Sequence, residues 1–288
     1  MAPPPTLDED LAALARRIDG ALRPPPVGRV VLPVREGDAL RGSFCAVQLA
    51  DGATGLSFVL LGDTREQLAR VDPAPLAGRA ALALAERLRD GDAGVRAIAL
   101  AAVNALARHL LDRARFTPDL ATNSLGSLPL GPGDRLGMVG FFPPLVQRAR
   151  DAGIPLTVLE LKEELVQDAP GLLVTLDPAR LAECNKIVVT SSTILNGSLD
   201  RLLPRTSHAA ELVIVGPSAT CVPDALFARG VTAVGGAWVT DPAALAERLA
   251  RGDPWGGAAR KFQVRRDGAW PGAEELLRRA GGYESASR

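Results

Sequence analysis

The pattern of apolar positions in the first part of the chain is helical, then strand-like, then helical again. A helix is predicted over 7–22, where leucines recur at helical spacing and PPP follows at 24–26. Asp51-Gly52 is a hairpin signal between the second and third of three strand-like runs: VGRVVLPV, SFCAVQLA and GLSFVLL. Two further helices, over 75–90 and 94–113, complete an α+β layout.

After residue 134 the pattern changes to short apolar runs that alternate with helical segments. The runs are RLGMVGF, PLTVLEL, KIVVT, ELVIVG and VTAVGGAWV, and a single helix is expected over STILNGSLDRLLPRT. This alternation predicts a mostly parallel, Rossmann-like sheet that contains residues near 136–140, 156–160, 187–190 and 212–216. The expected fold class is therefore α/β, with an α+β domain over 1–113, a linker over 114–134 and a Rossmann-like domain over 135–288.

The ligand site of such a sheet lies beyond the C-terminal ends of its strands, near the point where strand order reverses. The segments that follow the five predicted strands should therefore converge at one edge. These segments are Gly140-Phe141-Phe142-Pro143, Glu160, Thr190-Ser191-Ser192-Thr193, Gly216-Pro217-Ser218-Ala219 and Gly235-Gly236.

Four consecutive hydroxyl residues, Thr190 to Thr193, end the third of these strands. Together with the free N–H groups of a following helix, they would suit a carboxylate, a phosphate or a polar ring edge. The alternative is that they only cap the helix, but capping accounts for one or two of the four. A ligand site is the favoured interpretation.

Three other features near this edge allow two interpretations each. Gly216-Pro217-Ser218 is a functional turn or a plain one, and Asn196 reaches the ligand or bonds its neighbouring turn. Glu160 stands where dinucleotide folds place an acid that binds a ribose, or it is a solvated strand end.

Motifs for common cofactors and catalysts are missing from the sequence. The first strand-to-helix turn reads GFFPPLV instead of GxGxxG, so NAD, NADP and FAD are not expected, and no GxxxxGK[ST] or GxSxG occurs. His109 and His208 lie outside any HExxH or triad-like pattern, and His109 is expected to be a satisfied, partly buried residue. Cys45, Cys184 and Cys221 form no metal motif and are expected to be free and buried, although Cys221 could line the site.

The composition and charge of the chain make several classes of binding partner unexpected. The chain has 33 basic and 33 acidic residues and a formal net charge of zero, so neither nucleic acid nor an anionic membrane is expected as a partner. No signal peptide and no run of about 20 apolar residues is recognised. Three widely spaced cysteines fit a reducing, cytoplasmic setting.

Several segments resemble the family of unknown function known as the "putative heavy-metal chelation" domain. The resemblance rests on MVGFFPPLV, VLEL, VVTSSTILNGSLDRLL and IVGPSATCVPDALFARGVTAVGG, in that order and spacing. GSFCAVQLADGATGLSFVL and AIALAAVNAL are similar to its companion domain, whose fold is like the N-terminal domain of enolase. The resemblance covers most of residues 25–250 and implies a binding site in an interdomain cleft, with a heavy metal or metal chelate as ligand.

Carried over by position, the resemblance implies one set of ligand-binding residues: Gly140, Phe142, Glu160, Thr190, Ser191, Ser192, Thr193, Asn196, Gly197, Gly216, Pro217 and Ser218. It implies no particular metal ligand. The chain departs from the family pattern at Ser191, where a glycine is common, and at Ala219, where a threonine is common. Ser191 adds bulk to the turn and Ala219 removes a hydroxyl, so both changes bear on the ligand.

Two functions follow as hypotheses. The first is a binding or metal-homeostasis protein for a small polar or chelating ligand, and the second is an enzyme on such a ligand, a transferase or lyase without a nicotinamide cofactor. The lack of a recognisable nucleophile–base pair favours binding. The N-terminal domain is expected to close the cleft, with Asn104 or Cys45 as contributors, and a homodimer stays open.

Overall fold

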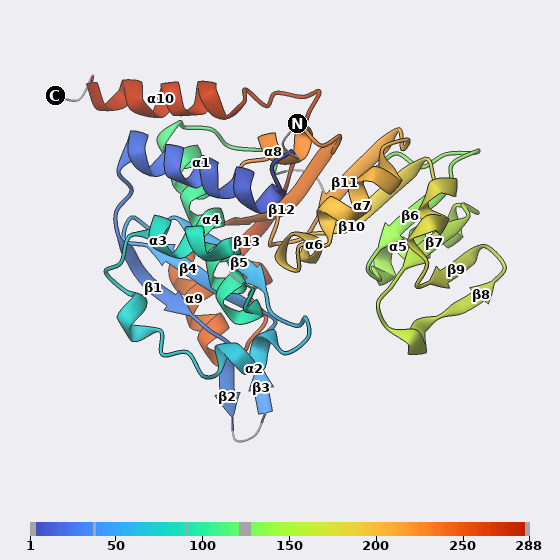
Figure 1. The fold of residues 1–288 in the computed structure, drawn as a ribbon, viewed down its shortest axis with the longest axis horizontal. Helices are drawn as coiled ribbons and strands as arrows, with labels where there is room; N and C mark the ends of the chain where they lie inside the picture. The colour runs from blue at the N-terminus through green and yellow to red at the C-terminus, as the bar shows by residue number, and fades with distance from the viewer. Residues whose placement is uncertain (1–3, 37–38, 90, 121–127, 286–288) are drawn as a thin grey trace.

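The computed structural model describes residues 4–36, 39–89, 91–120 and 128–285. Within these residues the strands form a three-stranded antiparallel sheet, an eight-stranded mixed sheet and a separate two-stranded hairpin (Figure 1). The expected fold class is confirmed, because a mostly parallel sheet follows an α+β region.

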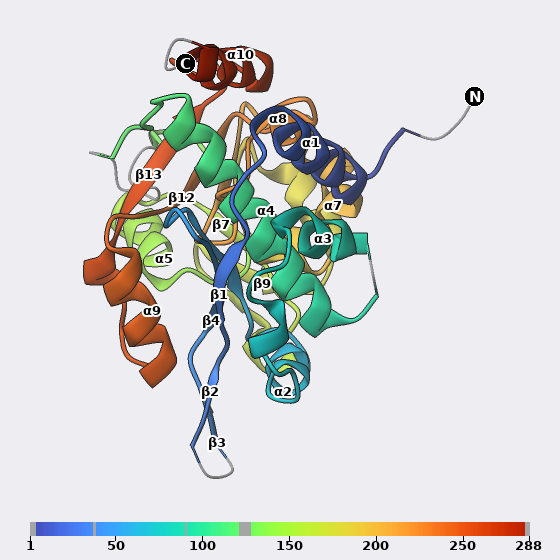
Figure 2. The same cartoon turned by 90° about the vertical axis from the view of Figure 1, so that its left-hand side faces the viewer.

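The first sheet is antiparallel and has the order β1-β4-β5, with β1 at Val27–Val31, β4 at Phe44–Leu49 and β5 at Thr54–Phe58. Helix α1 (Leu7–Leu22) begins with a capping box in which Thr6 and Glu9 bond each other's backbone N–H. The β2–β3 hairpin (Val34–Glu36 and Ala39–Arg41) projects from the body of the protein in both Figure 1 and Figure 2.

Helix α4 (Ala93–Arg113) packs closely on β5, and a glycine makes this possible. A Cβ at Gly55 would collide with the Ala101 carbonyl and the Ala105 nitrogen of α4. Helix α4 is long and apolar enough to pass a composition test for a membrane span, but 83% of its most apolar window is buried inside the protein. It is therefore placed as the central helix of a packed core.

The prediction of a single helix over 75–90 is wrong. The segment instead contains a 3₁₀ turn at Ala74–Leu76, helix α3 (Ala81–Ala85) and a 3₁₀ turn at Glu86–Arg89, and it is preceded by helix α2 (Thr64–Leu68). Gly78 has a φ of +80°, and the backbone around it hydrogen-bonds to Val27 of β1. Pairing with the strand edge therefore replaces helical hydrogen bonds at this point.

The large sheet has the order β13-β12-β11-β10-β6-β7-β9-β8. Its parallel strands are β6 (Leu136–Val139), β7 (Leu156–Leu159), β9 (Leu172–Thr175), β10 (Lys186–Thr190), β11 (Glu211–Val215) and β12 (Ala233–Val239). The edge strands β8 (Gln167–Ala169) and β13 (Ala259–Arg265) are antiparallel to their neighbours. The five expected strands are confirmed, whereas β8, β9 and β13 were not expected.

Strand order reverses between β6 and β10, since β7 and β9 lie on one side of this pair and β11 and β12 on the other. This is the doubly wound arrangement, in which the switch point opens a crevice for ligands. The helices of this region are α5 (Pro143–Asp151), α6 (Ser192–Leu195), α7 (Leu199–Thr206), α8 (Asp224–Phe227), α9 (Pro242–Arg251) and α10 (Ala273–Ser285).

The helix expected after the hydroxyl run is broken into α6 and α7. Gly197 has a φ of +66°, and the Asn196 side-chain oxygen accepts a hydrogen bond of 3.0 Å from the Ser198 N–H. An asparagine turn followed by a left-handed glycine ends α6 after one turn. The prediction of one continuous helix over residues 192–206 is therefore wrong.

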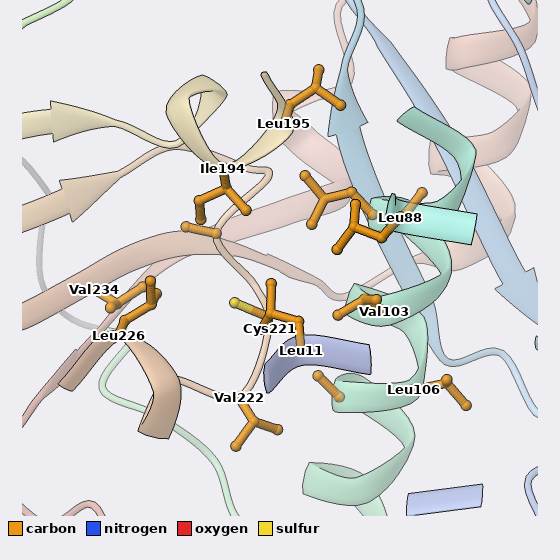
Figure 3. Packing of buried hydrophobic residues seen from close by; sticks show 14 of the residues in the cluster. Leu11, Leu88, Val103, Leu106, Ile194, Leu195, Cys221, Val222, Leu226 and Val234 are labelled. Atoms are coloured by element: carbon orange, nitrogen blue, oxygen red, sulfur yellow. The ribbon is translucent and has the colours of Figure 1, made fainter. Parts of the chain in front are cut away.

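One hydrophobic cluster contains residues from both expected domains. In Figure 3, Leu11, Val103 and Leu106 of α1 and α4 lie in the same cluster as Ile194 and Cys221, which follow β10 and β11. The expected division at 113 and 135 stays a prediction. Residues 121–127 of the expected linker lie outside the described residues.

Candidate functional site

Two glycines bring the hydroxyl run close to its neighbours at the sheet edge. Gly140 follows β6 with a φ of +84°, and a Cβ there would lie 3.0 Å from the Thr190 Cγ2. Gly216 follows β11 with a φ of +137°, and a Cβ there would collide with the Ser191 Oγ. Both positions require glycine because of their φ angle and because of the side chain packed against them.

The hydroxyls of the run bond mostly to one another and to local backbone. The Thr190 Oγ1 lies 3.0 Å from the Ser192 Oγ, and the Thr193 Oγ1 donates to the Thr190 carbonyl at 2.7 Å. Ser191 stands at the N-cap of α6 but makes no side-chain cap bond. The Thr190 Oγ1 accepts a hydrogen bond of 3.4 Å from the Ser192 N–H, so a cap-like bond accounts for one of the four hydroxyls. Helix α6 has only four residues, so it offers little helix dipole.

A main cavity of about 820 Å³ opens at this edge of the sheet. Ten of the expected site residues line it: Gly140, Phe142, Glu160, Thr190, Ser191, Ser192, Thr193, Asn196, Gly216 and Pro217. Phe44, Phe58, Leu60 and Leu61, from the first part of the chain, line it as well. The switch point between β6 and β10 thus forms the floor of the cavity.

Gly197 and Ser218 do not line the main cavity. Gly197 forms the break between α6 and α7, and Ser218 is completely buried. The Ser218 Oγ accepts a hydrogen bond of 2.9 Å from the Phe58 N–H, and its carbonyl accepts one of 3.0 Å from the Asn104 Nδ2. Asn104 also donates to the Leu56 carbonyl at 2.8 Å. Asn104 and Ser218 therefore join β5 to the cavity floor without reaching the cavity.

Glu160 organises the turn after β6. Its Oε1 accepts a hydrogen bond of 2.8 Å from the Phe141 N–H, and its Oε2 accepts one of 3.0 Å from the Leu161 N–H. Both carboxylate oxygens therefore have backbone partners. This geometry differs from that of an acid that presents itself to a ribose.

Exposed apolar side chains gather around the main cavity. Five large apolar side chains of the described residues are exposed, and four of them line it: Leu60, Phe141, Leu161 and Leu176. Leu161 is the most exposed, at 77%. Apolar surface collected around one concave site marks a place where a ligand or partner is bound.

The charged side chains of the main cavity are mostly cationic. Lys162, Arg201 and Arg205 line it together with the single carboxylate of Glu160, an excess of two positive charges in a chain of zero net charge. Arg201 and Arg205 lie one turn apart on α7, and their guanidinium groups have no partner among the residues that the structure describes. The sequence analysis missed these cations; their four-residue spacing shows only that they share one face of a helix, not that this face lines the cavity.

The donors present do not fit direct coordination of a soft metal ion. Within the described ranges, no three or more His, Cys, Asp or Glu side chains come together in an arrangement that could hold a metal ion. The three cysteines are free and buried, and none lines the main cavity. Desolvation by burial raises the pKa of Cys45 and of Cys221 to about 12, so both thiols are protonated near neutral pH in the metal-free protein. Cys45, Cys221 and Asn104, considered as contributors, thus lie outside this cavity.

A side pocket of about 270 Å³ lies on the other side of Gly216 and Pro217. It shares Phe142, Val215, Gly216 and Pro217 with the main cavity, and Gly236 of the fifth predicted strand lines it. The remaining lining is Ala237, Trp255, Gly256, Ala259, Arg260 and Lys261.

The fold is that of a doubly wound α/β protein with a cavity at its switch point. The chain belongs to the family described as "Putative heavy-metal chelation", whose model DUF364 matches residues 123–266. A second model with the same description, DUF4213, matches residues 38–107. The family expected from sequence is therefore confirmed.

Two solved structures share the fold. One is a protein of unknown function from the DUF364 family of Desulfitobacterium hafniense, with 20% identity, a TM-score of 0.64 and coverage of 88% of this chain and 98% of that chain. The other, of unknown function and from the same family in Pyrococcus horikoshii, has 20% identity, a TM-score of 0.66 and coverage of 88% and 99%. No match is found among curated proteins.

Proposed function

We propose that the main cavity binds a small organic anion that chelates a heavy-metal ion. The metal is held by this chelator, and the protein binds the chelator. The observation that carries the proposal is the lining itself, which combines exposed apolar walls, a floor of hydroxyls and an excess of cations around about 820 Å³. Pockets of about 300–1,000 Å³ with apolar walls and a few polar groups are typical of small-molecule sites.

The charge of the lining supports an anionic ligand. Arg201 and Arg205 are like charges one turn apart, an arrangement that destabilises a helix by about 0.2–0.5 kcal/mol when nothing neutralises it. A carboxylate between them would accept charge-assisted hydrogen bonds from both guanidinium groups. Lys162 adds a third cation at the same cavity.

The family description supports a role with heavy metals, and the donor set supports an indirect one. Soft metal ions prefer thiolate and imidazole ligands, whereas the described residues of this cavity offer hydroxyls, an amide and one carboxylate. A planar aromatic chelator would supply the metal ligands and would place its ring against the apolar wall of Phe58 and Phe141.

Binding is favoured over catalysis by a transferase or lyase. The only carboxylate of the described lining, on Glu160, accepts hydrogen bonds from two backbone amides. The Ser192 hydroxyl is paired with the Thr190 hydroxyl. Neither arrangement is a nucleophile with an adjacent base.

The proposal treats the main cavity as an interdomain cleft. Four lining residues, Phe44, Phe58, Leu60 and Leu61, precede the expected linker, and the rest of the lining follows it. A cytoplasmic setting is part of the proposal and is supported by three free, buried cysteines. Zero net charge supports a partner other than nucleic acid or a membrane surface. A homodimer stays a prediction.

The test is calorimetric titration of the purified chain with cadmium in excess pyridine-2,6-dicarboxylate, which forms an anionic chelate. We expect binding of this chelate, little binding of bare Cd²⁺, and at least tenfold weaker binding, about 1.4 kcal/mol, in the variant Arg201→Gln/Arg205→Gln. Cadmium with 1,10-phenanthroline, a cationic chelate with similar rings, should bind more weakly than the anionic chelate.

The matched control is Arg70→Gln/Arg150→Gln, which removes two exposed arginines that lie outside the cavity. This control should bind the anionic chelate as the wild type does. If both double variants lost the same amount of affinity for the anionic chelate, the loss would come from the change in net charge and not from a contact in the cavity. Tight binding of bare Cd²⁺ would show direct coordination and would contradict the proposal.

A further inference from the structure

One side of the main cavity is formed by the segment that contains the break between α6 and α7. Five residues of this segment line the cavity and are called the α6–α7 wall: Asn196, Ser198, Arg201, Leu202 and Arg205. The wall carries two guanidinium groups and the Asn196 amide, whose Nδ2 has no partner among the described residues. The position of the wall therefore decides where these polar groups meet a ligand.

Helix α7 has little internal support for its position. It has only eight residues, and helices of this length are unstable in water without tertiary contacts. Pro204 lies inside the helix and has no N–H to donate to the Asp200 carbonyl, four residues earlier. Gly197, with a φ of +66°, separates α7 from α6. The direction of α7 therefore depends on contacts with other elements.

The Asp200 side chain supplies such a contact. Its Oδ2 accepts a hydrogen bond of 2.9 Å from the N–H of Leu7, the first residue of α1, and its Oδ1 accepts one of 3.2 Å from the Arg229 Nε. Arg229 also donates to Asp10 of α1 at 2.7 Å and to the Pro5 carbonyl at 2.8 Å. Because the Arg229 side chain is only 16% exposed, its ion pairs are partly shielded from screening by salt.

Arg96 of α4 holds the chain on the other side of the break. Its Nε donates to the Leu195 carbonyl at the end of α6 at 2.8 Å, and its ion pair with Asp8 of α1 has a length of 2.7 Å. Arg96 also bonds to the Leu88 carbonyl, and Leu88 and Leu195 belong to one hydrophobic cluster in Figure 3. Both arginines therefore connect the α6–α7 segment to the first turn of α1, which lies beside α8 (Figure 1).

We propose that Arg96, Arg229 and Asp200 are positioning residues that tie the α6–α7 wall to the first turn of α1. The wall then presents Arg201 and Arg205 to the same anionic ligand. None of the three positioning residues lines the cavity, so each acts through the wall. The effect on ligand affinity rests on the proposed function, whereas the anchoring of the wall does not.

The anchoring is tested by hydrogen exchange of the full chain without ligand, followed by mass spectrometry. Asp200→Asn keeps the size of the side chain but removes its charge and one of its two acceptor oxygens. We expect the amides over 196–206 to exchange about threefold faster or more than in the wild type, and those of β6 to stay unchanged. Arg229→Lys should act in the same way, because a single ammonium nitrogen cannot bridge the acceptors of the guanidinium. This second variant carries the test if Asp200→Asn fails to fold.

The matched control is Asp224→Asn, which also removes a carboxylate that accepts two hydrogen bonds. The donors are the Trp270 Nε1 at 2.9 Å and the Ala273 N–H at 2.8 Å, so these bonds join α8 to the start of α10 and do not involve the α6–α7 wall. We expect wild-type exchange over 196–206 in this control. An equal rise in Asp224→Asn would show a general loss of structure and would overturn the assignment.

Ligand affinity separates positioning from simple electrostatics by the sign of the change. Loss of the Asp200 charge beside Arg201 would, by Coulomb attraction alone, strengthen the binding of an anion. If the wall loses its position, the affinity for cadmium with pyridine-2,6-dicarboxylate should instead fall about threefold or more, with no fall in Asp224→Asn.

Two results would overturn the proposal: unchanged exchange over 196–206 in both anchor variants, or unchanged or tighter chelate binding by Asp200→Asn. Either result would leave the proposed function intact if the wild type binds the chelate. A wild type that binds no chelate would defeat the proposed function, and the exchange rates alone would then decide whether the anchors hold the wall.

Discussion

Asn104 links strand β5 to the turn after β11, and its replacement should lower the stability of the protein. It is completely buried on α4, and its Nδ2 donates to the carbonyls of Leu56 and Ser218. The Asn104 Oδ1 is also buried but has no partner within the described structure. Asn104→Leu keeps the approximate volume and removes all of these polar atoms.

The size of the effect follows from the hydrogen bonds. Each buried carbonyl left without a donor costs about 1–3 kcal/mol, while removal of the orphan Oδ1 returns a similar amount. Two losses and one gain give a net destabilisation of about 2 kcal/mol. For chains somewhat shorter than this one, each kcal/mol of destabilisation lowers Tm by about 2–4 °C. The Tm of Asn104→Leu should therefore fall by about 4–8 °C.

Urea unfolding followed by circular dichroism measures this change. Ser57→Ala is the matched control on the adjacent strand β5, because the Ser57 Oγ is buried and without a partner in the described structure. Removal of this hydroxyl should leave stability unchanged or raise it by up to about 1 kcal/mol. If the free energy of unfolding of Asn104→Leu lay within about 0.5 kcal/mol of the wild-type value, the packing of β5 on the cavity floor would not depend on these hydrogen bonds. That result would refute the reasoning.

Two further predictions concern single hydrogen bonds. Burial acts to raise the pKa of Asp51, but hydrogen bonds from His109 and from the Ala53 N–H outweigh it and lower that pKa. A lowered pKa stabilises the fold above the unfolded value of about 3.9 and loses this effect as pH falls through the folded value. Asp51→Asn should therefore cost about 1 kcal/mol at pH 7, with the difference in urea midpoint closing in acid; a constant difference would contradict this. Thr193→Ala should cost about 0.5–1.5 kcal/mol through loss of its bond to the Thr190 carbonyl, and Thr193→Ser should restore it; equal midpoints for all three proteins would count against that role.

The sheet could be predicted from sequence because its strands have a strong local signal. The buried strands β6, β10 and β11 are short apolar runs bounded by Gly or Ser and Thr, and the α5 and α9 helices begin at proline. Strand β13 was missed because charged residues interrupt its sequence, ARKFQVR, and its position depends on pairing with β12. Tertiary pairing of this kind has no local sequence pattern.

The residues that follow the strands could be grouped from sequence, but their individual roles could not. Ser218 and Glu160 belong to the predicted set. Ser218 is buried and bonds to β5, however, and the Glu160 carboxylate accepts hydrogen bonds from two backbone amides. Arg201 and Arg205 were not predicted, because their position at the cavity depends on the Asn196 turn that reorients α7. The edge-to-face contact between Phe44 and Trp255 joins residues more than 200 positions apart, so only the fold brings them together.

The most direct measurement is the anomalous scattering of cadmium in crystals of the chain grown with cadmium and pyridine-2,6-dicarboxylate. The account predicts one strong peak inside the main cavity, surrounded by chelator atoms, with the chelator carboxylates beside Arg201 and Arg205. No protein sulfur or carboxylate oxygen should lie within the bonding distance of about 2.0–2.5 Å typical of metal ligands. A peak bonded directly to Cys, His, Asp or Glu side chains, or an empty main cavity beside an occupied site elsewhere, would contradict it.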